Sequence, residues 1–149
     1  MFWSLHYILL GISENTFYVA VFINIIGIAR AVVFSNKKLF RADNKLWLVG
    51  FISLYVTAYV LTFTVFGKTP TPTNLIFELL PVIAMTANTI GFSLKTARGT
   101  RLLNFVNSPC WLSYSIFSAS IGGIVSELLS ITATVIGYLR YDSKKKNQK

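Results

Sequence analysis

The basic residues of this chain lie between long apolar runs, and this distribution constrains its fold more than any other feature. All of these runs except the first approach the roughly 20 residues that a helix needs to cross a bilayer core of about 30 Å. Backbone amides in hydrocarbon must find partners within their own segment, so the runs are predicted to be helices. With 54% hydrophobic and 13% charged residues, the chain has too few polar side chains to cover a water-soluble globule. The runs extend over 1–12, 16–34, 46–66, 75–94, 102–118 and 123–139.

The charges also predict an orientation. Of the 14 Lys and Arg residues, only Lys68 falls outside the second connection, the fourth connection and the tail. Because basic residues are retained on the cytoplasmic side during insertion, these three regions, and with them the carboxyl end, are predicted to be cytoplasmic. The net charge of +9 then reflects topology and contact with the anionic headgroups of the lipid bilayer, and no nucleic-acid partner is expected.

The first run, residues 1–12, is too short to cross a bilayer unaided. It is either half a helix or the remainder of one that starts upstream, and an internal comparison favours the second interpretation. Residues 3–30 align with residues 111–140, and both copies carry a Trp, a tight outer turn and a helix that ends in Gly-x-x-Arg. Both copies cross the membrane in the same direction, as in a parallel repeat. The alternative is chance similarity between apolar helices.

Three segments resemble a known family. They are Glu78-Leu-Leu-Pro81-Val-Ile, the Asn107-Ser-Pro-Cys-Trp111 segment with Ser120-Ile-Gly-Gly123 and Glu127 after it, and the closing Ile136-Gly-x-x-Arg140. Together they resemble the YgjV-type proteins of the bacterial inner membrane. That family is similar to the larger PQ-loop and SWEET-like group, in which two three-helix bundles are joined by a linker helix.

The resemblance implies an all-α, polytopic membrane protein. Residues 1–34 would form an incomplete first repeat, because the first helix and half of the second have no counterpart here. Residues 35–74 would hold a basic cytoplasmic loop, the linker helix and an outer loop. Residues 75–140 would form the second three-helix repeat, and 141–149 a basic cytoplasmic tail.

For function, the resemblance implies a permease that moves a small polar solute by alternating access, with no substrate assigned. The alternative is a non-transporting membrane subunit that stabilises or regulates a partner membrane protein. A homo-oligomer that shares helices would also complete the shortened first repeat. The sequence has no Ser/His/Asp set, metal-ligand cluster or Gly-rich phosphate loop, so neither an enzymatic activity nor a cofactor is expected.

Three of the runs carry polar or small residues at three- and four-residue steps, which places each set on one helix face. Polar groups in lipid are costly, so these stripes should face one another or water inside the bundle. Close helix packing is the alternative role, favoured for Ser126, Ser130, Gly137 and Gly27. The three stripes are Asn104, Asn107, Trp111, Ser115 and Ser118; Ser126, Ser130, Thr134 and Gly137; and Glu78, Pro81, Met85 and Asn88.

In SWEET-like proteins, a pair of polar residues on the third helices faces the substrate and a neighbouring Trp stacks on it. The resemblance assigns these roles to Asn24, Thr134, Trp111 and Trp3. Thr134 departs from the usual Asn, because a hydroxyl does not offer the paired donor and acceptor of an amide. Ser115 and Asn88 complete the candidate substrate contacts.

Prolines and ionisable residues supply the remaining candidates. Pro81 and Pro109 fall in helices where SWEET-like transporters carry hinge prolines, and the alternative is a static kink. Glu78 and Glu127 are candidates for proton coupling, and the alternative is that each stabilises the first turn of its helix.

Four further residues have simpler expected roles. Arg30 and Arg140 are expected to extend to cytoplasmic headgroups as anchors. His6 is a weak candidate for a pH sensor. Cys110 is expected to be a buried packing residue.

Overall fold

The computed structural model describes residues 18–36, 40, 45–94 and 96–142, and its regular elements in these ranges are all helices. Each α-helix coincides closely with one of the apolar runs, so the prediction of an all-helical fold is confirmed. In chain order the elements are α2 (Tyr18–Ser35), α4 (Lys45–Thr64), α5 (Pro72–Ser93), α6 (Ala97–Phe117), α7 (Ile121–Gly137) and the short π-helix η1 (Tyr138–Asp142).

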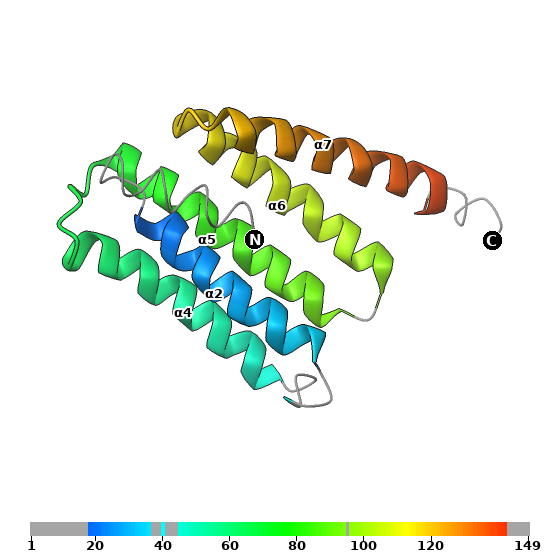
Figure 1. Ribbon diagram of the computed structural model, residues 1–149, viewed down its shortest axis with the longest axis horizontal. Coiled ribbons are helices and arrows are strands. Elements are labelled where there is room, and N and C mark those ends of the chain that lie inside the picture. Colours follow the sequence, from blue (N-terminus) through cyan, green and yellow to red (C-terminus); the bar gives the residue numbers. More distant parts are fainter. Residues whose placement is uncertain (1–17, 37–39, 41–44, 95, 143–149) are drawn as a thin grey trace.

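The helices form a bundle in which α5 occupies the centre (Figure 1). Helices α2, α4 and α5 pack on one another, α6 packs along α5, and α7 packs along α6 at the edge of the bundle. Side chains such as Ile23, Tyr55 and Met85 fill the core where α2, α4 and α5 meet. Helix α6 therefore lies between α5 and α7.

Local sequence signals fix where the helices begin. The Thr71 hydroxyl accepts a hydrogen bond from the Asn74 amide at 3.3 Å, and Pro72 occupies the first helical position of α5. Ser120 caps α7 in the same way, accepting from the Gly123 amide at 3.2 Å. Ala119 has a positive φ of 50°, a conformation that L-residues rarely adopt, and it lets the chain reverse between α6 and α7.

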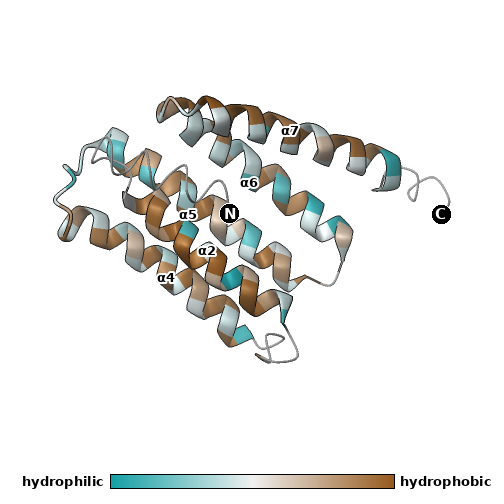
Figure 2. Ribbon diagram, viewed as in Figure 1, coloured by the Kyte–Doolittle hydropathy of each residue, from teal (hydrophilic) through white to brown (hydrophobic). Residues whose placement is uncertain are grey.

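Among the described residues, three helices are long and apolar enough to cross a membrane: Lys45–Thr64, Pro72–Ser93 and Ile121–Tyr141. Val19–Ser35 is a shorter apolar helix. Helix α6 has 21 residues but is absent from this set, so the crossing of the membrane by residues 102–118 stays a prediction. The helix is less hydrophobic than the others, because it includes Arg98 and Arg101 and, as Figure 2 shows, hydrophilic positions recur along it.

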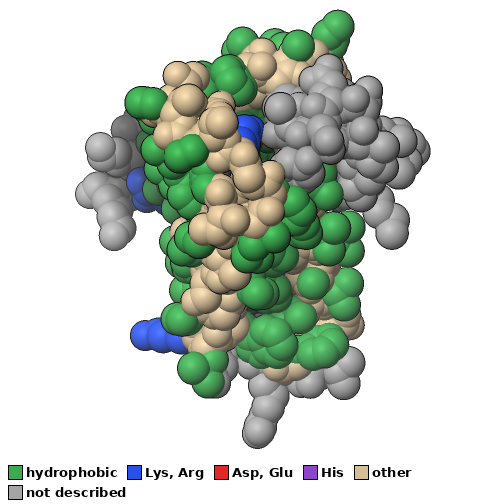
Figure 3. Space-filling model, turned by 90° about the vertical axis from the view of Figure 1, so that its left-hand side faces the viewer, with side chains coloured by type: hydrophobic (Ala, Val, Ile, Leu, Met, Phe, Trp, Pro, Cys, Tyr) green, Lys and Arg blue, Asp and Glu red, His purple; other side chains and the backbone are tan. Residues whose placement is uncertain are grey.

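Much of the exterior is apolar. Hydrophobic side chains dominate the face shown in Figure 3, on which no acidic side chain of the described residues is visible. The spanning window of α7 is only 11% buried, against 44% for α5. Large exposed apolar patches mark surfaces that meet lipid or protein rather than water.

Candidate functional site

A seam of polar side chains joins α6 to α7. Asn104 Nδ2 donates hydrogen bonds to Thr134 Oγ1 and, at 3.4 Å, to Ser130 Oγ. The hydroxyl oxygens of Ser108 and Ser130 lie 3.0 Å apart, and Thr134 Oγ1 donates to the Ser130 carbonyl at 2.8 Å. The prediction that the stripes of these two helices face each other inside the bundle is confirmed.

Glu127 extends this seam toward the beginning of α7. Its carboxylate contacts the Ser108 hydroxyl, and its Oε2 atom is buried without a hydrogen-bond partner among the described residues. The first turn of α7 contains no acidic residue, and Ser120 caps the helix. The interpretation of Glu127 as a first-turn residue is therefore wrong, because α7 begins earlier than its apolar run.

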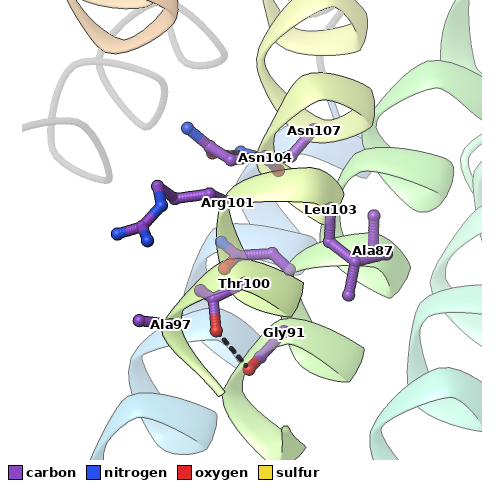
Figure 4. Close-up of a pocket in the computed structure, with 9 residues that line it drawn as sticks. Ala87, Gly91, Ala97, Thr100, Arg101, Leu103, Asn104 and Asn107 are labelled. Atoms are coloured by element: carbon purple, nitrogen blue, oxygen red, sulfur yellow. Dashed lines mark hydrogen bonds between the residues drawn. The ribbon is translucent and has the colours of Figure 1, made fainter. Parts of the chain in front are cut away.

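A cavity of about 440 Å³ opens between α5 and α6, close to the connection that joins them (Figure 4). This volume lies within the range of about 300–1,000 Å³ that is typical of small-molecule sites. The Thr100 hydroxyl ties the two helices together at this end by donating to the Gly91 carbonyl at 3.2 Å. The lining residues are Ala87, Asn88 and Gly91 from α5 and Ala97, Thr100, Arg101, Leu103, Asn104 and Asn107 from α6.

The amides connect the cavity with the polar seam. Asn107 Nδ2 donates to Asn104 Oδ1 at 3.3 Å, and Asn104 in turn donates to Thr134 and Ser130. Asn107 Oδ1 is buried and has no hydrogen-bond partner in the described part of the chain. The structure thus brings the predicted residues Asn88 and Thr134 to one region, the first in the cavity and the second beside it.

The other candidate substrate contacts lie elsewhere. Asn24 is half-buried on α2, and its Nδ2 donates to the Ala20 carbonyl of its own helix at 2.7 Å. Because α2 packs on α4 and α5, whereas Thr134 faces α6, the structure does not bring Asn24 and Thr134 together. Trp111 is buried in the core, edge-on to Tyr114 with ring centroids 5.9 Å apart. Trp3 lies outside the described residues, as does His6.

Ser115 and the two prolines have packing environments of their own. Ser115 is buried against α7, where a Cβ on Gly123 would lie 2.9 Å from Ser115 Cβ. This close approach requires glycine and fits a packing role. Pro81 is buried inside α5 and Pro109 is exposed on α6. Both prolines lie inside continuous helices, and their role as hinges stays a prediction.

Arg30 is buried inside the bundle, with only 5% of its surface exposed. Its Nη1 donates to Thr89 Oγ1 at 3.1 Å and to the Met85 carbonyl at 3.4 Å, and its guanidinium carbon lies 4.9 Å from the Phe92 ring centroid. The expectation of a headgroup anchor is therefore wrong. The signal was available, because apolar residues continue α2 past Arg30 to Phe34 and so keep the guanidinium away from the helix end.

A second buried charge is neutralised at the opposite end of α5. Glu78 is 1% exposed and forms an ion pair with Lys68, which lies in the connection between α4 and α5. Thr71 caps α5 and its first turn contains no acidic residue, so the capping interpretation is wrong for Glu78 as well. The signal here was that Lys68 is the one basic residue predicted on the outer side.

Arg140 and Cys110 are the remaining candidates among the described residues. Arg140 is exposed and its guanidinium carbon lies 5.5 Å from the Tyr141 ring centroid, so its role as an anchor stays a prediction. Cys110 is half-buried. In the described ranges, no group of three or more His, Cys, Asp or Glu side chains is arranged to hold a metal ion.

An apolar exterior, helices long enough to span a bilayer and polar groups turned inward together define a polytopic helical membrane protein. The chain matches the family model Imp-YgjV, bacterial inner membrane protein, over residues 1–145, and it belongs to that family. The family match places the protein in the bacterial inner membrane, in contact with the lipid bilayer. No curated protein and no solved structure matches the chain.

Proposed function

We propose that this chain is a small-solute permease of the inner membrane, working by alternating access, with the cavity between α5 and α6 as its solute site. One observation carries the proposal: three Asn side chains and Arg101 line a cavity of about 440 Å³ in a bundle whose exterior is apolar. Polar and charged groups at membrane depth cost free energy and are usually retained for function.

The polar seam supports a coupling role for Glu127. Hydroxyl and amide groups lead from Asn107 in the cavity through Asn104 and Ser130 to Ser108, which contacts the Glu127 carboxylate. Such a chain is suited to relaying a proton between a carboxylate and a solute site. Glu78 is the weaker candidate, since Lys68 neutralises it.

The proposal also includes the orientation of the chain in the membrane and its relationship to the PQ-loop and SWEET-like group. With the basic connections on the cytoplasmic side, the connection between α5 and α6 is cytoplasmic, and the cavity opens in that half of the membrane. The carboxyl end lies on the same side. The proposed place within the PQ-loop and SWEET-like group rests on the sequence resemblance, and no enzymatic step is part of the proposal.

The test is uptake by proteoliposomes that contain the full chain, with a panel of radiolabelled small polar solutes. Asn88→Leu fills the cavity from α5 and should abolish saturable uptake without reducing membrane insertion. Ser113→Leu is the matched control, because Ser113 is exposed on α6 outside the cavity lining and should leave uptake unchanged. Saturable uptake that survives Asn88→Leu would contradict the proposed site.

The second candidate function is a non-transporting subunit that stabilises a partner membrane protein. The observation that favours it is the position of α7, which packs along α6 at the edge of the bundle and leaves most of its surface uncovered. A partner or a second copy of the chain would cover that face. Absence of saturable flux for every solute, together with one partner that copurifies in fixed stoichiometry, would favour this function over transport.

A further inference from the structure

We infer that the end of the bundle at which α6 begins and α7 continues into η1 binds an anionic phospholipid with two phosphates, of the cardiolipin type. This lipid site is independent of the proposed function, because it lies on the exterior of the bundle and not on a solute path. Three features support it: two arginines that share one aromatic ring, the position of that ring at the end of a membrane-spanning segment, and exposed apolar side chains close by.

The two arginines come from different helices and meet at Tyr141. The guanidinium carbon of Arg101, on α6, lies 5.8 Å from the Tyr141 ring centroid, and that of Arg140, on η1, lies 5.5 Å from the same centroid. In Figure 4 the Arg101 side chain points away from Ala87 and Leu103. The two positive charges contact one ring and are therefore close enough for a single headgroup to reach both.

Local structure on α7 and η1 brings the arginines together. A Cβ on Gly137 would lie 3.3 Å from Arg101 Cδ, so the aliphatic part of Arg101 packs on α7 where the glycine leaves room. Directly after Gly137 the chain forms the π-helix η1, which carries both Arg140 and Tyr141. Single π-helical turns are rare and occur frequently at functional sites. The glycine and the π-helix thus place groups from two helices at one ring.

The charge of this region favours a ligand with more than one negative charge. Residues 97–101 and 138–149 together contain seven Lys and Arg residues and a single acidic residue, Asp142. Arg140 is exposed and makes no hydrogen bond or ion pair with the described residues. A guanidinium that stacks on a ring keeps its N–H donors in its own plane, where they bind phosphate oxygens in pairs. Basic sites between membrane helices bind cardiolipin headgroups in this way.

Tyr141 lies where the headgroups of the bilayer are expected. It is the last residue of the apolar segment Ile121–Tyr141, which is long enough to cross a membrane, and it is 57% exposed. Tyr is enriched at this depth because it combines an apolar ring with a polar hydroxyl. Exposed apolar side chains within four residues of Arg101 or Arg140 offer a surface for acyl chains: Leu102, Phe105, Ile136 and Leu139. Phosphates at the arginines and acyl chains on this surface fit one phospholipid molecule.

The test is lipid binding by the full chain, delipidated in detergent and analysed by native mass spectrometry at about 0.15 M salt. Cardiolipin carries two phosphates, phosphatidylglycerol carries one, and phosphatidylcholine has no net charge. Glycerol bisphosphate has two phosphates and no acyl chains. Cardiolipin should bind about tenfold more tightly than phosphatidylglycerol, because only cardiolipin places a phosphate at each arginine. Phosphatidylcholine should bind more weakly still, and excess glycerol bisphosphate should not displace cardiolipin.

Arg140→Gln and Arg101→Gln should each weaken cardiolipin binding about tenfold. Tyr141→Leu should weaken it as well, although no charge is removed, because the ring that holds both guanidinium groups is lost; Tyr141→Phe should retain the binding. Arg98→Gln is the matched control, since Arg98 is exposed on α6 and has no ring contact among the described residues. It removes the same charge and should weaken binding only about twofold, because salt screens a charge that does not touch the phosphate.

Equal losses for Arg98→Gln and Arg140→Gln would show diffuse attraction to basic residues and overturn the site. Unchanged binding by Tyr141→Leu would also overturn it, because the shared ring would then have no role. Phosphatidylglycerol that binds as tightly as cardiolipin would overturn the assignment to two phosphates. Displacement by glycerol bisphosphate would assign the site to a soluble phosphate compound and overturn the lipid. If Arg101→Gln does not fold, Arg140→Gln and the two Tyr141 variants decide, since both residues are exposed.

Discussion

Thr89 is the side chain through which the buried charge of Arg30 is accommodated, and its replacement tests the packing of α2, α4 and α5. The Thr89 hydroxyl donates to the Met85 carbonyl at 2.6 Å and accepts from Arg30 Nη1 at 3.1 Å. Its oxygen also lies 3.0 Å from the Tyr55 hydroxyl, which must donate because the single Thr89 proton is already used. Thr89→Val keeps the shape of the side chain and removes all three hydrogen bonds.

The expected cost follows from the partners that lose a bond. A hydrogen bond to a charged group contributes about 1.5–3 kcal/mol, and a neutral one between membrane helices contributes about 0.6 kcal/mol. Thr89→Val should therefore lower the free energy of unfolding by about 2–4 kcal/mol. Arg30→Met should change it little or raise it, because an apolar side chain of similar length replaces a charge that is costly to bury. In the Arg30→Met background, Thr89→Val should cost only about 1 kcal/mol, since the neutral bonds alone are lost.

The assay is a double-mutant cycle on the purified chain, unfolded by titrating denaturing detergent into mixed micelles. The expected coupling between Arg30 and Thr89 is about 1–3 kcal/mol. Thr132→Val is the matched control: Thr132 is exposed on α7 and its hydroxyl donates within its own helix, to the Leu128 carbonyl at 2.8 Å. Additive costs, or a loss below about 0.5 kcal/mol for Thr89→Val, would refute the view that Thr89 compensates the buried charge.

Three further predictions follow from the packing and the topology. Lys68→Met leaves the Glu78 carboxylate buried without its partner and should destabilise the fold by about 3–5 kcal/mol in detergent unfolding, whereas adding Glu78→Gln should restore most of the loss; no rescue would show that the ion pair is not the cause. Gly123→Ala places a Cβ 2.9 Å from Ser115 Cβ and should increase proteolysis at the turn between α6 and α7; unchanged proteolysis would mean that the helices tolerate the extra volume. Lys45→Cys and Thr73→Cys, each in a cysteine-free background, should react with impermeant reagents from opposite sides of the membrane, and labelling from one side would contradict the positive-inside topology.

The sequence predicts the helices well because their cause is local. Apolar length alone requires a helix in lipid, and side chains such as Thr71 and Ser120 fix where two helices begin. The sequence also predicts that the polar stripes of α6 and α7 face each other. Asn104 belongs to the stripe on α6 and Thr134 to the stripe on α7, and neither side chain would find a hydrogen-bond partner in lipid.

Which helix lies beside which is not predictable in the same way. In lipid, an apolar helix face packs equally well against hydrocarbon and against another helix. Hydropathy therefore does not distinguish faces that meet lipid from faces that meet a neighbouring helix. Neighbours are chosen by close packing, as where the absence of a Cβ on Gly27 makes room for Met85 Cε, which would lie 2.6 Å from such an atom. Near this contact Arg30 bonds to Thr89. The position of Arg30 within α2 indicates its burial, but neither its partner Thr89 nor the separation of Asn24 from Thr134 follows from local pattern.

Equivalent positions in the two aligned segments have different environments in the bundle. Arg30 and Arg140 hold equivalent positions in the aligned segments, yet the first is buried against α5 and the second is exposed beside Tyr141. The difference arises because α2 packs on two helices, whereas α7 packs mainly on α6. Equivalent residues thus acquire different environments from the number of neighbours their helix has.

The central position of α5 links the two polar regions of the bundle. Met85 and Thr89 hold Arg30 on one face of the helix, while Asn88 and Gly91 line the cavity on another. Both regions lie on the segment after Pro81, which has no amide proton to donate to the preceding turn. A bend of α5 at Pro81 would move both regions together, so a solute bound at the proposed site would act on the same element as the charge of Arg30. The cavity and the Arg30 site could then be coupled without direct contact. Coupling would require only that the solute and the Arg30 interactions each favour one position of the α5 segment after Pro81.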